Sequence, residues 1–462
     1  MSPSTPLTLK RPGLRLTVLA TASLMAGSAW ATNGMLMEGY GPQATAMGGA
    51  AQAYDNGTAA MANNPATLQL APKGTRADLA LGLLGPKVRT EVPGFPVAKS
   101  GGDRYAMPAM GWVRNEGPWS YGVGLMGQGG MGTEYGADTA LAMGTGEDVR
   151  SELAVGRVIF PMAFRLNPSV NIGASLDYAW MSLDMKMAAT VPMLSQMVTG
   201  AEGMFGQTLA NPAGPLSQAQ WARIDFSDGN DFTGEAKARG WTGKLGMTWQ
   251  MAPGLMLGAS HHFKTALPDM KTGARGARIS AGGYNPATGA AVTGLADEGQ
   301  IVVRDFQMPA STSLGLAWQA TPSTLVVADV KRVGWASSMK QFAMTYTSAG
   351  DMMAGGVDFA MPQNWKNQTV VQFGLAHQLS DALVLRAGYN RASNPIPDAY
   401  VNPLFPATVK AHYTAGLGYR LSERMSFDAA ISHAPTVTVT SGAGARISHS
   451  QTNYQFLLGY RY

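Results

Sequence analysis

The chain has no cysteine, few charged residues and no long apolar run beyond its N-terminal segment. Only 14% of its 462 residues are charged, against about 25% in an ordinary soluble protein. The absence of cysteine excludes disulfides and thiol chemistry. After residue 31 no run approaches the roughly 18 apolar residues that a membrane-spanning helix needs, which excludes a bundle of transmembrane helices.

The first 31 residues have the organisation of a secretory signal peptide. Lys10, Arg11 and Arg15 precede a short apolar run over 16–26, and Ala29-Trp30-Ala31 has the A-x-A pattern of a cleavage site. We expect cleavage after Ala31; the alternative is a retained membrane anchor. Loss of the three cations lowers the net charge from +5 to +2 (31 Lys+Arg minus 29 Asp+Glu), a balance that does not indicate nucleic-acid binding.

The sequence does contain period-2 alternation, most clearly at its C-terminal end. One face of the last strand is apolar and aromatic, and the other is mostly polar. The apolar face carries Tyr454, Phe456, Leu458, Tyr460 and Tyr462. Tyrosines at this density suit the interface girdle of a membrane barrel. We predict a closing barrel strand, read by the barrel-assembly machinery through its end at Tyr462; the alternative is an edge strand of a soluble sandwich.

Further alternating segments predict an all-β, antiparallel transmembrane barrel over 76–462. The segments lie near 76–90, 103–115, 118–129, 151–166, 169–186, 240–251, 254–270, 303–320, 323–346, 367–379, 382–392, 409–421, 424–437 and 447–462, fourteen in all. Tight turns such as Asn167-Pro168 and Ser422-Glu423 alternate with long segments near 130–150, 187–239, 271–302 and 347–366. Short periplasmic turns and long outer loops are typical of outer-membrane barrels.

Residues 32–75 do not alternate and are rich in glycine, alanine, methionine and asparagine. The segment is too long for a barrel turn and too apolar for a solvated tail. We predict that it forms a hatch inside the lumen, because a barrel this wide would otherwise enclose an aqueous channel. The alternative is a periplasmic extension.

Several motifs resemble one family. Thr32-Asn33-Gly34, Gly39-Tyr40-Gly41, Met47-Gly48-Gly49-Ala50 and Asn64-Pro65-Ala66 resemble the hatch of the FadL-type outer-membrane transporters (OmpP1/FadL/TodX), the long-chain fatty-acid and aromatic-hydrocarbon channels. The segment 121–127 is similar to the family's third strand, and 385–398 to its eleventh strand and following loop. The hatch residues carried over are Asn33, Gly34, Asn64, Pro65 and Ala66.

The resemblance implies a fourteen-stranded barrel with a hatch and a passive mechanism without cofactor or metal. Hydrophobic compounds would be captured among the outer loops and released sideways into the membrane through a gap at the third strand. We expect long-chain fatty acids as the substrate; aromatic hydrocarbons or alkanes are the alternative, and a diffusion porin or a surface adhesin are rivals. The expected partners are outer-membrane lipid, lipopolysaccharide and hydrophobic small molecules, around a monomer.

An apolar cluster at the start of the third outer loop is the candidate capture surface. Methionine is flexible and recurs on surfaces that accept ligands of different shape. The candidates are Met185, Met187, Met193, Leu194, Met197, Met204 and Phe205. The alternative is a small core of the loop itself.

Glycines at the end of the third strand are the candidate lateral gate. Gly127, Gly129 and Gly130 would weaken strand pairing and mark a bulge. The alternative is the flexible start of a loop.

Inward-facing charges complete the candidate sites. Parity places Arg157 beside Asp177, Arg420 diagonal to Asp428, and Lys331 and Arg386 inside the barrel. One cation among Arg157, Lys331 and Arg386 would hold a fatty-acid carboxylate; the alternative is that these charges tie hatch to wall. The sequence contains neither a G-x-S-x-G nor an H-E-x-x-H motif, so we expect no enzyme.

Overall fold

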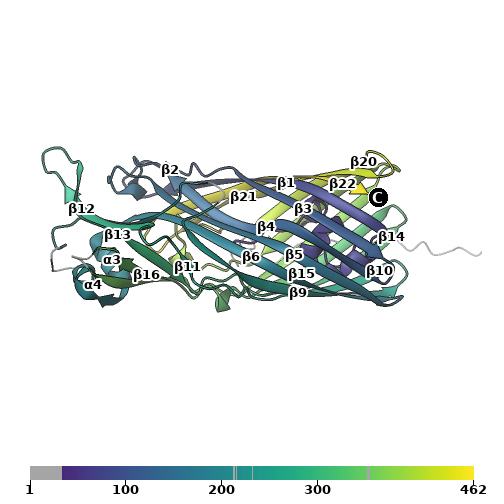
Figure 1. Ribbon diagram of the computed structural model, residues 1–462. Helices are drawn as coiled ribbons and strands as arrows, with labels where there is room; N and C mark the ends of the chain where they lie inside the picture. The colour runs from purple at the N-terminus through teal and green to yellow at the C-terminus, as the bar shows by residue number, and fades with distance from the viewer. Residues whose placement is uncertain (1–33, 212–213, 215, 231–232, 351–353) are drawn as a thin grey trace, which may run out of the picture.

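The strands form one continuous antiparallel sheet that closes into a barrel (Figure 1). The computed structural model describes residues 34–462 except 212–213, 215, 231–232 and 351–353. The expected signal peptide and Asn33 lie outside the described residues. Closure is made by the pairing of β22 with β1, from Arg76 opposite Arg461 to Glu91 opposite Arg446.

The long strands of the wall run in chain order around the barrel. They are β1 (Gly74–Glu91), β3 (Tyr105–Glu116), β4 (Trp119–Tyr135), β5 (Val149–Asn167), β6 (Val170–Ala189), β9 (Ala236–Ala252), β10 (Leu255–His262), β14 (Ser311–Thr321), β15 (Thr324–Val333), β18 (Gln368–Gln378), β19 (Leu383–Ala392), β20 (Ala411–Arg420), β21 (Met425–Thr440) and β22 (Arg446–Arg461). The predicted antiparallel β-barrel is thus confirmed.

The expected number of fourteen strands is corrected, because the ring followed through the strand pairings contains 18 strands. The four additional strands are β8 (Trp221–Phe226), β11 (Met270–Lys271), β12 (Ala277–Tyr284) and β13 (Ala291–Arg304). β6 pairs with β9 over Val170–Leu183 but with β8 over Met185–Ala189. The ring therefore continues through β8, β12, β13 and β11 before it returns to β9. These strands extend the wall at the outer end, where we expected loops.

Further elements cap this outer end. They are β7 (Val198–Glu202), β16 (Gln341–Ser348), β17 (Gly355–Pro362), α3 (Val191–Met197) and α4 (Gly203–Ala210), with the short β2 (Ala98–Lys99). In Figure 1, α3, α4, β12, β13 and β16 gather at one end of the barrel and the C-terminus lies toward the other. The expected single strand over 323–346 is in fact β15 and β16, separated by a 3-10 turn at Trp335–Ser337.

At the opposite end, tight turns join consecutive strands, as predicted. β5 and β6 are joined by Pro168 and Ser169, and β9 and β10 by Pro253 and Gly254. Proline and glycine supply the backbone angles that such turns need. No helix among the described residues has the length and apolar character to cross a bilayer.

The alternation in β22 separates the outside of the barrel from its inside. Tyr454 and Tyr460 are exposed on the outer face, whereas Asn453 and Gln455 are buried inside. The same alternation holds in β20, where Tyr413 is exposed and His412 is buried. Side chains of successive strand residues point to opposite faces, so apolar groups meet lipid while polar groups meet the barrel contents.

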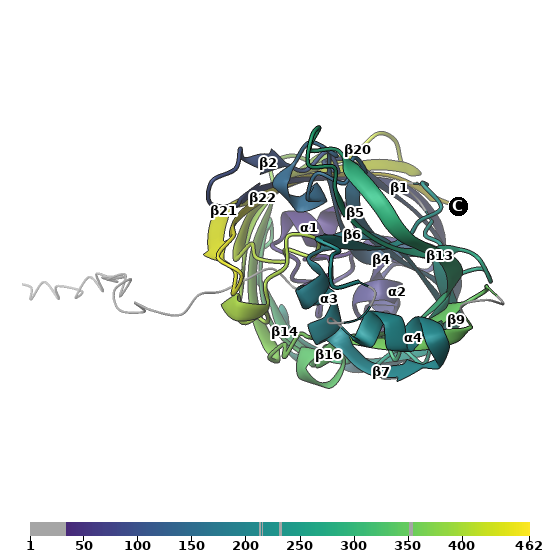
Figure 2. The same cartoon turned by 90° about the vertical axis from the view of Figure 1, so that its left-hand side faces the viewer.

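The N-terminal residues fill the space that the wall encloses. Figure 2 shows α1 (Pro42–Ala46) and α2 (Ala60–Asn63) inside the ring of strands. Two 3-10 helices, η1 (Gly57–Ala59) and η2 (Pro65–Leu70), complete the segment. α1 contacts β19, β20, β21 and β22, and η2 contacts β5, β6 and β9. The segment thus reaches opposite sides of the wall.

Candidate functional site

Polar groups of the wall hold the N-terminal segment in place. The Asp329 carboxylate accepts hydrogen bonds from the backbone N–H of Ala51 (2.7 Å) and of Gln52 (3.1 Å). The Gln372 amide donates to the carbonyl oxygen of Glu38 (2.8 Å). Because these groups are buried, the bonds are costly to lose. They give the inward-facing side chains a structural role.

The predicted hatch motif Asn64-Pro65-Ala66 is a contact point with the wall. The Asn64 side chain accepts a hydrogen bond from Ala66 N–H (3.1 Å) and donates to the carbonyl oxygens of Gln52 (2.8 Å) and Met247 (3.1 Å). Gly246 admits this contact, since a Cβ there would lie 2.0 Å from Asn64 Oδ1. At the other end of the segment, a Cβ on Gly34 would lie 2.5 Å from the Trp335 ring.

The wall is interrupted between β3 and β4. The two strands pair only from Ala109 opposite Met126 to Glu116 opposite Trp119. Beyond that point, residues 105–108 remain paired with β1, and 127–135 follow β5 through a bulge between Gly127 and Gly129. Among the described residues, no ladder pair joins 105–108 to 127–130, so the sheet is open there.

The backbone of the N-terminal segment lies against β4 beside this opening. Leu36 forms an isolated bridge with Gly129, and Gly130 N–H donates to the Met35 carbonyl oxygen (3.2 Å). A Cβ on Gly129 would lie 2.1 Å from that oxygen, and one on Gly130 would lie 2.4 Å from the carbonyl oxygen of Leu153. Two of the three glycines predicted as a gate are therefore required for close backbone approach.

A cavity of about 340 Å³ adjoins the opening. Its lining includes 105–108 of β3 and Gly127, Gly129 and Gly130 of β4, and its apolar wall includes Met35, Met107, Met126, Leu153 and Trp180. This volume falls at the lower end of the roughly 300–1,000 Å³ of small-molecule sites. The polar residues of the lining are Glu38, Glu152, His412, His449, Gln451 and Asn453, and no lysine or arginine is among the described residues of the lining.

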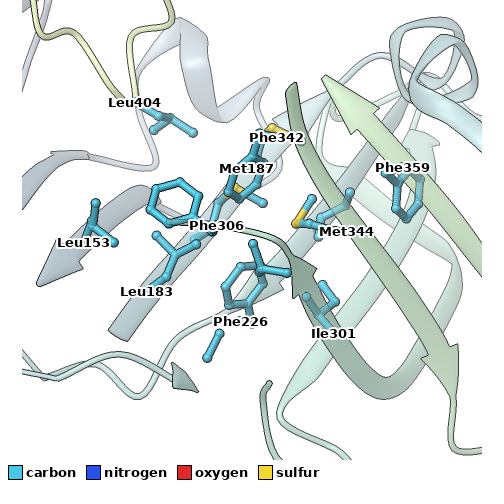
Figure 3. Close-up of a cluster of buried hydrophobic side chains, with 14 of the residues drawn as sticks. Leu153, Leu183, Met187, Phe226, Ile301, Phe306, Phe342, Met344, Phe359 and Leu404 are labelled. Carbon is cyan, nitrogen blue, oxygen red and sulfur yellow. The ribbon is translucent and has the colours of Figure 1, made fainter. Parts of the chain in front are cut away.

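A second, smaller apolar cavity lies toward the outer end. It measures about 30 Å³ and is lined by Met35, Met185, Met187, Phe306 and Phe342, among others. Figure 3 shows Met187, Phe306 and Phe342 close together, with Leu183, Leu153 and Leu404 beside them. The Phe306 and Phe342 rings meet edge to face, 6.0 Å between centroids. Met35 is in the lining of both cavities.

The residues predicted as one capture surface are divided by the structure. Met185 and Met187 line the smaller cavity. Leu194 of α3 and Phe205 of α4 are buried, and the Phe205 ring packs 5.1 Å from that of Tyr346. Met193 and Met204 are exposed at the outer end, and Met197 at the end of α3 is partly buried.

None of the three candidate carboxylate-binding cations is in the lining of the large cavity. Arg157 is buried in an ion pair with Asp177 (2.8 Å), as parity predicted, and also contacts His262 Nε2 (2.8 Å) and the Tyr40 ring (5.8 Å to its centroid). Arg157 thereby joins the wall to the N-terminal segment.

Arg386 and Lys331 lie elsewhere in the wall. Arg386 pairs with Asp428 (2.8 Å), which also accepts a hydrogen bond from the Gln43 amide (3.0 Å). The strand register does place Arg420 diagonal to Asp428, as predicted. The Asp428 carboxylate, however, pairs with Arg386. Lys331 lies opposite Ser313 and Val370 in the wall.

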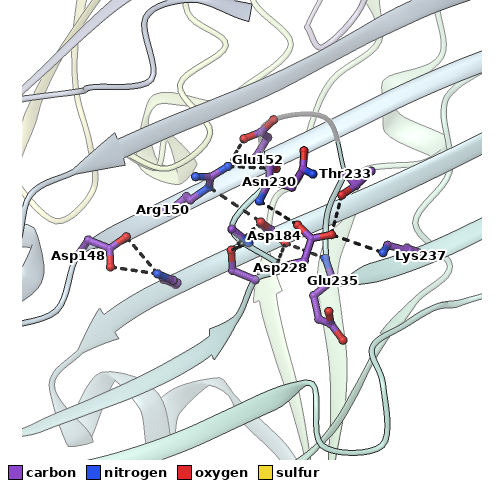
Figure 4. A network of polar contacts seen from close by, with 12 residues as sticks. Asp148, Arg150, Glu152, Asp184, Asp228, Asn230, Thr233, Glu235 and Lys237 are labelled. Carbon is purple, nitrogen blue, oxygen red and sulfur yellow. Dashed lines mark hydrogen bonds and ion pairs between the residues drawn. The ribbon is translucent and has the colours of Figure 1, made fainter.

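A polar network joins residues between β8 and β9 to Asp184 of β6 (Figure 4). Asp184 accepts hydrogen bonds from Ser227 Oγ (2.6 Å) and from the N–H groups of Asp228 (3.2 Å) and Glu235 (2.7 Å). Arg150 pairs with Glu152 (2.6 Å), which offsets the negative charge of a residue in the lining of the large cavity. No group of three or more metal-ligating side chains was found within the described parts of the chain.

Sequence reasoning missed the polar residues of the cavity. Glu38, His412 and His449 are not among the site residues predicted from the sequence. The opening itself was predicted only through glycine clustering and family resemblance. The pairing of 105–108 with β1 alone has no sequence signal of its own.

Comparison with known proteins identifies the family. The family described as "Outer membrane protein transport protein (OMPP1/FadL/TodX)" matches residues 19–458. The toluene transporter TodX of Pseudomonas putida is 31% identical, with a TM-score of 0.81 over 92% of this chain and 99% of that chain. The toluene transporter TbuX of Ralstonia pickettii is 28% identical, with a TM-score of 0.74 over 92% and 99%.

More distant matches add less. A FadL homologue of Pseudomonas aeruginosa shares the fold at 16% identity, with a TM-score of 0.69 over 93% and 99% of the two chains. An uncharacterized protein of Chlorobium limicola, encoded 5′ to a phosphoenolpyruvate carboxykinase gene, is 43% identical over 76 residues, 16% of this chain and only 37% of that protein. The chain belongs to the OMPP1/FadL/TodX family and is an outer-membrane transporter of hydrophobic compounds.

Proposed function

We propose that the protein is a passive channel for small hydrophobic compounds and that it prefers monoaromatic hydrocarbons to long-chain fatty acids. The observation that carries this preference is the lining of the 340 Å³ cavity, which is largely apolar. Its polar residues include Glu38 and Glu152, and none of its described residues is a lysine or arginine. A carboxylate placed there would lie near Glu38 and would have no lysine or arginine among the described lining residues to pair with, since Arg150, which pairs with Glu152, is outside the lining. A hydrocarbon carries no charge, so it meets no repulsion there and needs no cation.

The neighbours in sequence support the same preference. TodX and TbuX are toluene transporters by description, and they are 31% and 28% identical to this chain, whereas the FadL homologue is 16% identical. The fatty-acid channel expected from the sequence therefore gives way to its alternative.

We infer the following path. Compounds first meet the apolar residues Met187, Phe306 and Phe342 at the outer end, pass Met35 and enter the large cavity. They leave between β3 and β4, where the wall ladder is open, and enter the membrane. Transfer from water to apolar surroundings favours capture at roughly 25 cal/mol per Å² of apolar surface buried, and the later steps stay in apolar surroundings, so no energy source is required.

In this proposal, residues 34–73 act as the hatch. They occupy the lumen, so the opening in the wall is the exit that remains beside the cavity. Lateral exit also keeps an apolar compound out of water.

The test is uptake of labelled toluene and labelled oleate by cells lacking their own transporters, with and without this protein. We expect the protein to accelerate toluene entry and to leave oleate entry near background. Accelerated oleate entry with unchanged toluene entry would contradict the proposed preference. Crosslinking of β3 to β4 across the opening tests the path.

A further inference from the structure

One end of the large cavity differs chemically from the rest. His449 of β22, His412 of β20 and Glu38 of the N-terminal segment are all buried in its lining. Tyr413, the neighbour of His412, pairs with His433, and the next residue of β21, Ala434, pairs with Gln451, two residues from His449. Asn453, also of β22, contacts Glu38 Oε1 through its Nδ2 (3.5 Å). The three polar groups thus belong to one end of the cavity, which we call the histidine end (Glu38, His412, His449).

The hydrogen-bonding state of His449 follows from its contacts. Its Nδ1 lies 2.7 Å from the Pro406 carbonyl oxygen, which can only accept, so Nδ1 carries the proton. The neutral ring then presents Nε2 as an acceptor. Nε2 is buried and has no partner among the described residues. An acceptor in this state matches a ligand that brings a hydrogen-bond donor.

The neighbouring groups select the same chemistry. The Glu38 carboxylate is an acceptor, and Asn453 Nδ2 donates to it over a long distance (3.5 Å). His412 Nδ1 is buried without a partner among the described residues. A hydroxyl can donate to His449 Nε2 or to the Glu38 carboxylate and accept from the His412 ring. A carboxylate would instead lie beside Glu38 as a second anion.

We propose that the histidine end is a subsite for the hydroxyl of a phenol, so that the channel takes hydroxylated monoaromatic compounds as well as hydrocarbons. The ring would occupy the apolar part beside Met107, Leu153 and Trp180, with its hydroxyl directed at His449 Nε2. The inference rests on the channel function proposed above and narrows its substrate class.

Binding to the purified protein tests the subsite without relying on transport. Labelled p-cresol, toluene and p-toluate share one ring and differ in a single substituent. Each is equilibrated with the full chain in nanodiscs, and empty nanodiscs supply the blank. We expect p-cresol to bind more tightly than p-toluate, and His412→Leu/His449→Leu to weaken p-cresol binding about 3- to 10-fold, as expected for one lost hydrogen bond. Toluene binding should not weaken in this variant.

The matched control is His433→Leu. His433 is on the outer face of β21, where its Nδ1 contacts Thr452 Oγ1 (2.9 Å), so this change removes a histidine without touching the cavity. Heat-dependent migration on gels reports whether each variant is folded. If the double variant does not fold, the single variant His449→Leu takes its place in the same comparison.

Two results would overturn the subsite. One is equal binding of p-cresol and p-toluate to the wild type; the other is undiminished p-cresol binding to a folded double variant, which would mean that the histidine end holds water only. Failure of the channel proposal looks different: p-cresol then binds with the expected dependence on the histidines, but cells show no accelerated uptake of either p-cresol or toluene.

Discussion

The Met35 carbonyl oxygen occupies the space that a side chain on Gly129 would need, since a Cβ there would lie 2.1 Å away. One residue on, Gly130 N–H donates to that same oxygen. The N-terminal segment and the bulged part of β4 are therefore in backbone contact beside the opening in the wall. Any side chain at 129 must displace one from the other.

The first prediction concerns this contact. Gly129→Val should push 35–36 away from β4, lower stability by about 1–3 kcal/mol as overpacking does, and reduce toluene uptake by displacing Met35 into the path between the cavities. Thermal unfolding and labelled uptake measure the two effects. Gly82→Ala is the control in β1, because its Cβ would meet only ordinary contacts at 3.5 Å or more. Equal uptake by wild type and Gly129→Val would contradict the role of this contact.

The second prediction concerns the volume of the large cavity. Val155 is buried in its lining, so Val155→Trp should fill the space that a monoaromatic ring would take. We expect toluene uptake to fall at least several-fold. Val330→Trp is the matched control, since Val330 is 48% exposed on the lipid face. If Val155→Trp transports toluene at the control rate, compounds do not pass through this cavity.

The third prediction concerns closure of the wall. Ala106 of β3 and Met131 of β4 are in the lining of the cavity, on two strands that are not paired with each other at these positions. A cysteine pair at these positions, in a chain that has no other cysteine, should allow a bifunctional thiol crosslinker to hold the opening. Toluene uptake should drop on crosslinking and recover on cleavage of the linker. A pair at Ala109 and Met126, which already face each other in the ladder, is the control. Uptake unaffected by a completed crosslink at 106 and 131 would exclude this exit.

The fourth prediction concerns Arg157. Its guanidinium and the Asp177 carboxylate are both buried, so Arg157→Leu leaves a buried carboxylate without its partner and should cost about 3–5 kcal/mol. Arg157→Leu/Asp177→Leu removes both charges and should recover most of that loss. Arg332→Leu, at an exposed residue bonded to Thr369, is the control. Denaturant unfolding measures all three; a selective loss of oleate uptake at unchanged stability would instead make Arg157 a carboxylate site.

The fifth prediction concerns the hatch. Asp329→Ala removes the acceptor of the Ala51 and Gln52 N–H groups, which leaves two buried donors unpaired. We expect more frequent opening of the lumen, seen as brief conductance events in a planar bilayer. Deletion of 34–66 should give a steady conductance. The exposed Asp381→Ala is the control, and a silent bilayer for the deletion would argue against the hatch.

Strand alternation is the part of this architecture that could be read in advance. In β20 and β22 the lipid forces every second residue to be apolar, because the bilayer offers no partner to a polar side chain. The strands β8, β11, β12 and β13 were not predicted, because alternation is expected only where the wall contacts lipid. They extend the wall beyond β6 and β9 at the outer end, where their outer faces need not alternate, so 221–226 and 277–304 read as loops.

The chemistry of the interior followed the same division. Parity in a strand decides which residues face inward, and a tight turn decides which neighbours they meet, so the pairing of Arg157 with Asp177 was predictable. The pairing of Asp428 with Arg386 was not predictable, because Arg386 is two strands away and reaches Asp428 across Gly418. A Cβ on Gly418 would lie 2.7 Å from the carboxylate and 2.8 Å from the guanidinium.

Inward or outward orientation is a local property of a strand, and residue order alone determines it for most of this barrel. The meeting of Glu38, His412 and His449 around one cavity, and of Met35 with Gly129 at the opening, joins residues separated by up to several hundred positions. Such contacts depend on how the chain closes upon itself and on what its lumen contains. Only the tertiary structure could decide them.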